Sequence, residues 1–157
     1  MAYFQSTRRV NHSAEAMFNL VVDAEKYPEF LPYCTGLKVM RRVTGPDGRM
    51  TLIAQMTVGY GPISECFASR VTLDADRQRI HVQYVDGPFK HLDNRWSFRD
   101  VGEGQSDVDF SIDYAFKSRT FEILAGSVFD RLFRKMAEAF EQRADDLAKT
   151  PNEVSRA

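Results

Sequence analysis

The sequence contains little of what metalloproteins and nucleotide-dependent enzymes require. Its three histidines, His12, His81 and His91, are scattered, and its two cysteines do not form a Cys-x-x-Cys motif. Zinc and related metals need closely spaced histidine or cysteine ligands, so we expect no metal site. A glycine-rich phosphate loop is also missing, because the glycines of residues 59–61 lack the closely following glycine and the helix that such a loop requires.

Long apolar runs are absent as well. No segment approaches the roughly 18 consecutive apolar residues that suggest a membrane-spanning helix. Residues 1–10 contain two arginines and lack the apolar stretch of a signal peptide. We therefore expect a cytoplasmic protein in which Cys34 and Cys66 are free thiols.

Neither charge sign is in clear excess. Lysine and arginine number 21, aspartate and glutamate 22, and the net charge is -1. This balance argues against non-specific nucleic-acid binding, which needs clustered positive charge, and we expect no DNA partner. Asp107, Asp109 and Asp113 share one predicted strand face, and we interpret that face as solvated rather than catalytic.

Catalysis by side chains is also poorly supported. An enzyme would need a nucleophile and a base, or polar groups converging in a cavity. The predicted inward-facing polar residues are tyrosines, Cys34 and Asn94. We expect no catalytic residues and no enzyme, with a cyclase-like activity as the remaining alternative.

The chain is rich in phenylalanine, with twelve in 157 residues, and its last third shows two distinct periods. Residues 107–116 alternate polar and apolar side chains, which predicts a strand with one buried aromatic face. Beyond residue 119 the apolar period becomes about 3.6, which predicts a long amphipathic helix. Its apolar stripe comprises Phe121, Leu124, Ala125, Val128, Leu132, Met136, Phe140, Ala144 and Leu147.

The preceding residues predict a strand at 3–10, a helix from an N-cap at Ser13 to about Ala24, and further short strands. Short turns between these strands indicate antiparallel pairing, and one-sided alternation indicates that one sheet face is covered. Only the terminal helix is long enough to cover it. We predict one α+β domain over residues 1–150, a curved antiparallel sheet of about six to seven strands around the helix. Residues 151–157 show no pattern, and we expect a disordered tail.

Methionine and aromatic residues gather on the predicted inner faces and in the turns leading to them. Taken singly, each residue would usually belong to a core. As a set they are typical of a pocket for an irregular apolar ligand, to which methionine and aromatic side chains adapt. Residues 27–34 are expected to form either a plug that closes one end of the core, or an entrance or a lip that touches a membrane surface. The candidate ligand-binding residues are Phe30, Leu31, Tyr33, Met56, Phe67, Tyr84, Phe89, Trp96, Phe110, Tyr114, Phe129, Phe133 and Met136.

Three segments carry a resemblance to a known family. They are Tyr-Pro-Glu-Phe-Leu-Pro-Tyr-Cys at 27–34, Asp-Gly-Pro-Phe at 86–89 with the apolar residues after it, and the helix after Phe116. The chain resembles the coenzyme Q-binding proteins of the polyketide cyclase/START-like superfamily, and also the related ribosome-association toxin RatA. It departs at Tyr33, where mitochondrial members usually carry tryptophan.

The resemblance implies a helix-grip fold with a tunnel between sheet and helix. It implies ubiquinone, or a similar isoprenoid or lipid, as a bound ligand without a covalent cofactor. Tyr84, Tyr114 or Trp96 could donate a hydrogen bond to a quinone carbonyl. A quinone carrier or chaperone would support respiration or quinone biosynthesis, with peripheral contact at the cytoplasmic membrane. The alternative is a toxin-like module that binds the large ribosomal subunit and blocks subunit association.

Overall fold

The computed structural model describes residues 2–156, and the side chains of residues 2–149. One seven-stranded antiparallel sheet has the strand order β1-β7-β6-β5-β4-β3-β2. The strands are β1 (Ala2–Val10), β2 (Cys34–Thr44), β3 (Met50–Tyr60), β4 (Ile63–Asp74), β5 (Arg79–Asp86), β6 (Phe89–Gly102) and β7 (Gln105–Phe116). The helices are α1 (Ala14–Val22), the 3-10 helix η1 (Ala24–Glu29) and α2 (Arg119–Arg156).

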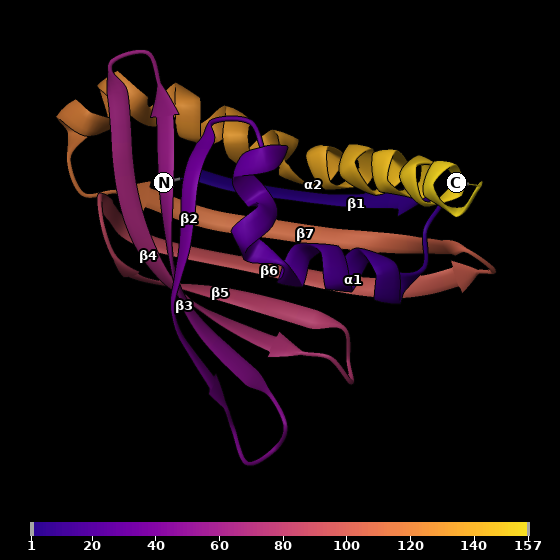
Figure 1. The fold of residues 1–157 in the computed structure, drawn as a ribbon. Coiled ribbons are helices and arrows are strands. Elements are labelled where there is room, and N and C mark those ends of the chain that lie inside the picture. Colours follow the sequence, from indigo (N-terminus) through magenta and orange to yellow (C-terminus); the bar gives the residue numbers. More distant parts are fainter. Residues whose placement is uncertain (1, 157) are drawn as a thin grey trace.

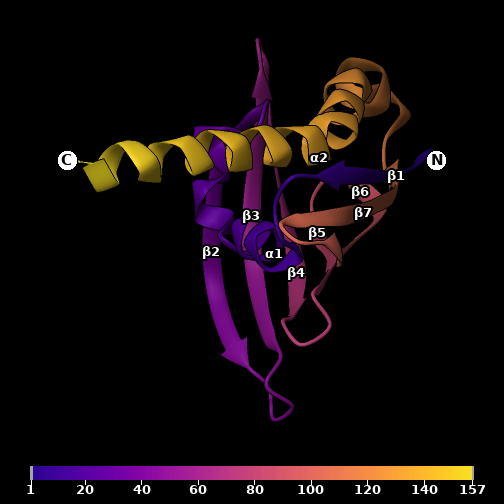
Figure 2. The same cartoon turned by 90° about the vertical axis from the view of Figure 1, so that its right-hand side faces the viewer.

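The sheet is strongly curved. In Figure 1, β1, β7, β6 and β5 run across the view while β2, β3 and β4 rise steeply through it. Helix α2 lies along the upper side of the sheet, and α1 and η1 lie inside the curve. In the turned view of Figure 2, α2 crosses the sheet and its C-terminal half continues past β2. The predicted α+β fold is confirmed.

The alternation predicted for β7 is present. Val108, Phe110, Ile112 and Tyr114 are each at most 4% exposed, whereas Asp109 and Asp113 lie on the opposite face. Most of the predicted α2 stripe is buried too. Its buried members are Ala125, Val128, Leu132, Met136 and Phe140.

For two members of the predicted stripe, the predicted burial is wrong. Leu124 is 66% exposed and Leu147 is 41% exposed. Leu124 lies on the flank of the stripe because each residue advances by about 100° around the helix axis. Leu147 has the right phase, but it lies in the C-terminal half of α2, which continues past the sheet.

Helix α2 continues through Arg156 and so covers most of the segment 151–157, for which the sequence predicts a disordered tail; residue 157 lies outside the described part. Helix propagation adds one backbone hydrogen bond per residue and does not require an apolar pattern. In addition, α1 and η1 share the covering of the sheet with α2, since α1 contacts β6 and β7 and η1 contacts β2.

Ion pairs hold the second half of α2 against the rest of the molecule. Arg8 Nε of β1 lies 2.5 Å from a carboxylate oxygen of Glu141. Arg143 Nη2 lies 2.7 Å from Glu29 Oε1, which links α2 to η1. His12 Nε2 lies 2.6 Å from Asp145 Oδ1. Within the described residues, no helix is both long and apolar enough to cross a bilayer.

Candidate ligand cavity between the sheet and the long helix

An apolar cavity of about 80 Å³ lies between the concave face of the sheet, α1, η1 and α2. Its walls come from β2 to β7 and from all three helices, so it forms only when the complete fold assembles. Five of the predicted ligand-binding residues line it, namely Met56, Phe67, Trp96, Phe133 and Met136. Further lining residues that we did not propose from sequence include Tyr27, Leu52, Ala54, Ser69, Ile80, Val82 and Leu92.

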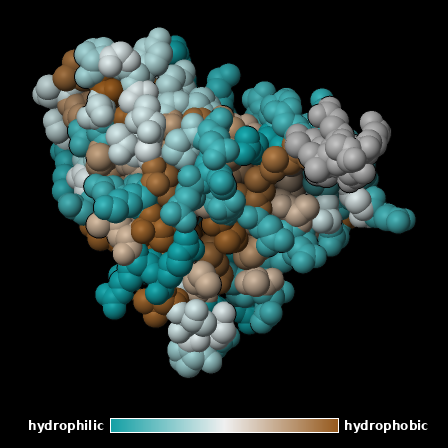
Figure 3. Space-filling model, in the orientation of Figure 1, coloured by the Kyte–Doolittle hydropathy of each residue, from teal (hydrophilic) through white to brown (hydrophobic). Residues whose placement is uncertain are grey.

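The opening of the cavity is marked by lining residues that are only half-buried. Two of these residues are Val22, which ends α1, and Leu37 on β2. Val71 and Val82 face each other across β4 and β5. In Figure 3, hydrophobic side chains show through the hydrophilic surface in the middle of the face that carries α1 and η1. An apolar molecule would therefore meet apolar side chains at the cavity opening.

Phe89, Phe110 and Phe129 are predicted ligand contacts that lie in the core instead of at the cavity. Each is at most 1% exposed. Phe89 stacks on Phe116 with ring centroids 5.0 Å apart and meets Phe129 edge-on at 5.2 Å. Phe89 and Phe129 fill the end of the space between sheet and helix at the start of α2, whereas Phe110 packs against Trp96 at 4.8 Å.

A glycine makes this aromatic cluster possible. Gly87, in the Asp-Gly-Pro-Phe segment, has φ +144°, and a Cβ added there would lie 2.6 Å from Phe67 Cβ. The chain can therefore pass directly against β4 only if residue 87 has no side chain. This close passage positions Phe89 for its edge-on contact with Phe67, at a ring-centroid distance of 5.3 Å.

The tyrosines proposed as hydrogen-bond donors have other partners. Tyr84 Oη accepts a hydrogen bond from the Phe89 backbone N–H at 3.1 Å. Tyr114 Oη donates to Asp130 Oδ1 at 3.2 Å, and burial, followed by the Asp130 charge, raises the pKa of Tyr114. Neither residue lines the cavity.

Residues 27–34 close one end of the core. Phe30 packs edge-on against Phe140 at 5.0 Å, and the Arg143 guanidinium lies 5.1 Å from the centre of its ring. Leu31 is 3% exposed. Tyr33 adopts φ +66° and contacts Tyr60 at 5.5 Å, away from the cavity. These contacts fit a plug better than an open entrance.

The polar atoms inside the cavity are few. Asn94 Nδ2 donates to the Ser111 carbonyl at 2.8 Å, and Asn94 Oδ1 accepts from Trp96 Nε1 at 3.0 Å. Tyr27 Oη donates to the Val21 carbonyl, and burial raises the pKa of this tyrosine. Ser69 Oγ is buried and has no hydrogen-bond partner among the described residues. Among the described residues, no group of three or more His, Cys, Asp or Glu side chains is arranged to hold a metal ion.

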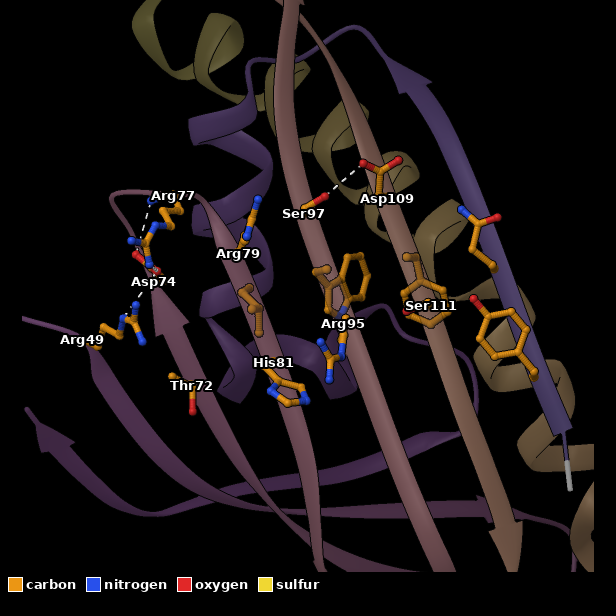
Figure 4. A pocket seen from close by; sticks show the side chains of 15 residues that line it. Arg49, Thr72, Asp74, Arg77, Arg79, His81, Arg95, Ser97, Asp109 and Ser111 are labelled. Atoms are coloured by element: carbon orange, nitrogen blue, oxygen red, sulfur yellow. Dashed lines mark hydrogen bonds and ion pairs between the residues drawn. The ribbon is translucent and has the colours of Figure 1, made fainter.

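The outer face of the sheet carries a second, open hollow of about 720 Å³. Figure 4 shows Arg49, Arg77, Arg79, His81 and Arg95 gathered there with Asp74 and Asp109. Arg49 and Arg77 lie 3.5 and 3.4 Å from Asp74 Oδ2. The balanced net charge conceals this local cluster, because its members are dispersed along the sequence and meet only through strand pairing.

The acidic residues of β7 lie on this outer face, as predicted, but they are paired rather than simply solvated. Asp107 Oδ1 lies 2.6 Å from Arg9 Nε, and Asp107 is only 8% exposed. Burial tends to raise the pKa of Asp109, but hydrogen bonds from Arg99, Thr7 and Ser97 outweigh it and the net shift is downward.

The histidines of the outer face do not meet each other. His81 lies 2.7 Å from Asp93 and His91 lies 3.1 Å from Asp113, each measured from Nε2 to a carboxylate oxygen. They therefore act as separate polar contacts along the sheet.

A curved antiparallel sheet that grips a long C-terminal helix over an apolar cavity defines the helix-grip class of START-like folds. The family described as polyketide cyclase / dehydrase and lipid transport matches residues 10–141, and the chain belongs to this family.

Two kinds of relative are similar to the chain. The ribosome association toxin RatA of Escherichia coli K12 is 35% identical over 147 residues, covering 94% of this chain and 89% of the relative. The mitochondrial coenzyme Q-binding protein COQ10 homolog B of Xenopus laevis is 29% identical over 145 residues, covering 90% of this chain and 57% of the relative.

Solved structures agree on the fold. The 18 kDa protein CC1736 of Caulobacter crescentus is 33% identical with a TM-score of 0.75, covering 95% of this chain and 99% of that one. The ZhuI aromatase/cyclase from Streptomyces sp. R1128 has a TM-score of 0.78 at 14% identity, covering 92% and 93%. At that identity the second likeness concerns the fold alone.

Proposed function

We propose that this protein binds ubiquinone, or a similar isoprenoid or lipid, in the cavity and carries it in support of respiration or quinone biosynthesis. The observation that carries the proposal is the apolar cavity between sheet and helix, with methionines from β3 and α2 in its wall. The family description, which includes lipid transport, and the name of the coenzyme Q-binding relative support it.

Binding, rather than catalysis, suits the side chains present. The polar residues lining the cavity are Tyr27, Ser69, Asn94 and Trp96, and among the described lining residues none is a carboxylate, histidine or cysteine. A general acid–base pair would normally draw on those residue types. The site therefore offers shape, apolar surface and hydrogen bonds.

The cavity must expand when a ligand enters. Its volume of about 80 Å³ is small beside the roughly 300–1,000 Å³ of pockets for drug-sized ligands. Met56 and Met136 have flexible side chains that can move aside, and the valines at the opening are only half-buried. Each CH₂ of an isoprenoid tail that leaves water contributes about 0.8 kcal/mol toward this rearrangement.

The test is to purify the protein without detergent from a quinone-producing bacterium, extract it with organic solvent and identify the extracted molecules by mass spectrometry. We expect bound ubiquinone, and its loss in Phe133→Asp. Leu124→Asp is the matched control, because the same substitution lies on the same helix at a side chain 66% exposed.

Ala54→Leu gives a second route if Phe133→Asp does not fold, since it places extra carbon atoms in the cavity from β3. A folded Ala54→Leu variant should retain less ubiquinone than the wild type. A wild-type protein that carries no apolar molecule and takes up none of the added ubiquinone would contradict the proposal.

A second candidate function is association with the ribosome. Relatives named for ribosome association include one that is 35% identical to this chain, and the outer hollow presents four arginines that suit a phosphate backbone. Among the described residues Arg79 forms no ion pair, unlike Arg95, which lies 2.9 Å from Asp93. This makes Arg79 the most available cation of the hollow.

Co-sedimentation with large ribosomal subunits over a series of salt concentrations tests this candidate. Arg79→Glu should weaken association and flatten its salt dependence, because fewer counterions are released. Arg131→Glu is the control, an exposed arginine on α2 away from the hollow. No association of the wild type at low salt would remove this candidate.

A further inference from the structure

The hydroxyl of Ser69 is an exception to the rule that buried polar groups have partners. Ser69 is 5% exposed and lines the cavity, and within the part of the chain that the structure describes its Oγ has no hydrogen-bond partner. A buried hydroxyl without a partner is destabilising, so such a group calls for an explanation. A molecule bound in the cavity would supply the missing partner of this hydroxyl.

The strand geometry places this hydroxyl where there is room beside it. Ser69 pairs with Ala54 on β3, and both small side chains line the cavity. On its other side the register shifts, so that Ala68 pairs with Asp86 while Ser69 pairs with Tyr84. This irregularity is a β-bulge, a feature that re-aims side chains and occurs often beside functional sites.

The neighbouring polar groups are already engaged. Tyr84 Oη accepts from the Phe89 backbone, and the Trp96 indole donates to Asn94. Asn94 in turn donates to the Ser111 carbonyl. Among these polar side chains, Ser69 is the one whose hydroxyl has no partner within the described residues, so a ligand can use it without breaking a hydrogen bond of the protein.

We infer that the Ser69 hydroxyl donates the hydrogen bond that recognises a carbonyl oxygen of the apolar ligand. The inference rests on the proposed function and makes it more specific. A quinone carbonyl can only accept, so the protein must supply the donor. The hydroxyl would thus fix the head group at the β3–β4 side of the cavity while the tail occupies apolar wall.

The experiment compares decylubiquinone with decylbenzene, which carries the same tail but no oxygen. We expect Ser69→Ala to weaken decylubiquinone binding about five- to tenfold, the usual effect of one lost hydrogen bond, and to leave decylbenzene binding unchanged. Ser69→Thr keeps the hydroxyl and should restore the preference for the quinone. Ser64→Ala, at an exposed position on the same strand, is the control.

Stability provides an independent readout. Without ligand, Ser69→Ala should unfold at the same denaturant concentration as the wild type or a higher one, because it removes an unpartnered hydroxyl.

Each other outcome overturns the inference. If Ser69→Ala weakens both probes equally and also lowers stability, the hydroxyl holds only a buried water or a packing contact, and the quinone-binding proposal itself survives. If neither probe binds the wild type, the proposed function falls together with the inference.

Discussion

Two residues on one face of α2 distinguish the core from the cavity. Leu132 is 0% exposed and packs in the core, whereas Met136, one helical turn later and 6% exposed, lines the cavity. Truncating Leu132 to alanine opens a new void, and such changes cost about 2–5 kcal/mol, rising by about 24 cal/mol per Å³ of void. Leu124→Ala, at a side chain 66% exposed, should change stability by no more than about 0.5 kcal/mol.

Met136→Ala should behave differently from both Leu132→Ala and Leu124→Ala. This substitution enlarges an existing cavity of about 80 Å³. The unfolding free energy should therefore fall by about 2 kcal/mol, the lower end of the range for truncating a buried methionine. The enlarged space should accept an apolar ligand more readily. Added decylubiquinone should therefore recover much of the stability lost in Met136→Ala but little of that lost in Leu132→Ala.

Urea unfolding followed by the fluorescence of Trp96, the single tryptophan of the chain, measures both effects. Trp96 is 4% exposed and borders the cavity, so its emission reports unfolding directly. The reasoning is refuted if ligand stabilises the two truncated variants equally, or if Leu132→Ala costs no more than Leu124→Ala.

Three further predictions follow from local geometry. Gly87→Ala should destabilise the fold by more than Gly48→Ala in denaturant unfolding, since both have positive φ but only the first Cβ would meet a clash at 2.6 Å. Burial tends to raise the pKa of Asp109, but its hydrogen bonds lower the pKa by a larger amount, so the net shift is downward. Ionised Asp109 therefore stabilises the fold at neutral pH, and this stabilisation is lost as the pH falls through the lowered pKa. Asp109→Asn should therefore show a smaller loss of unfolding free energy than the wild type between about pH 5 and pH 2. Burial raises the pKa of the Cys34 thiol to about 11, so at pH 8 a thiol reagent should modify exposed Cys66 quickly and Cys34 only as the protein unfolds.

Periodicity within single elements could be predicted from the sequence. The alternation in β7 and the helical stripe through Leu132 and Met136 are local patterns, each produced by burial of one face. Five cavity residues could be predicted because they lie on the inward faces of β3, β4, β6 and α2. The curvature of the sheet decides which buried aromatic side chains border the cavity and which fill the core, and a single sequence does not show that curvature.

Other features depend on contacts between distant residues. The partner of Tyr114 is Asp130 of α2, and sequence alone could not exclude Tyr114 as a donor to a ligand. Ser69 attracts no attention in the sequence, because its isolation appears only when its neighbours across β3 and β5 are known. The signal that could have found it is a small polar residue on the inward side of an otherwise apolar strand face. The outer arginine cluster likewise arises from strand pairing.

The measurement that tests the central claim most directly is NMR of protein labelled with ¹³C at its methionine methyl groups, during titration with decylubiquinone. Met56 and Met136 line the cavity, whereas Met40 is 56% exposed on β2 and lies outside it. If the quinone binds between the sheet and α2, the methyl signals of Met56 and Met136 shift and that of Met40 does not. If Met40 shifts while the two cavity methionines stay unchanged, or if no signal moves, the cavity is not the binding site.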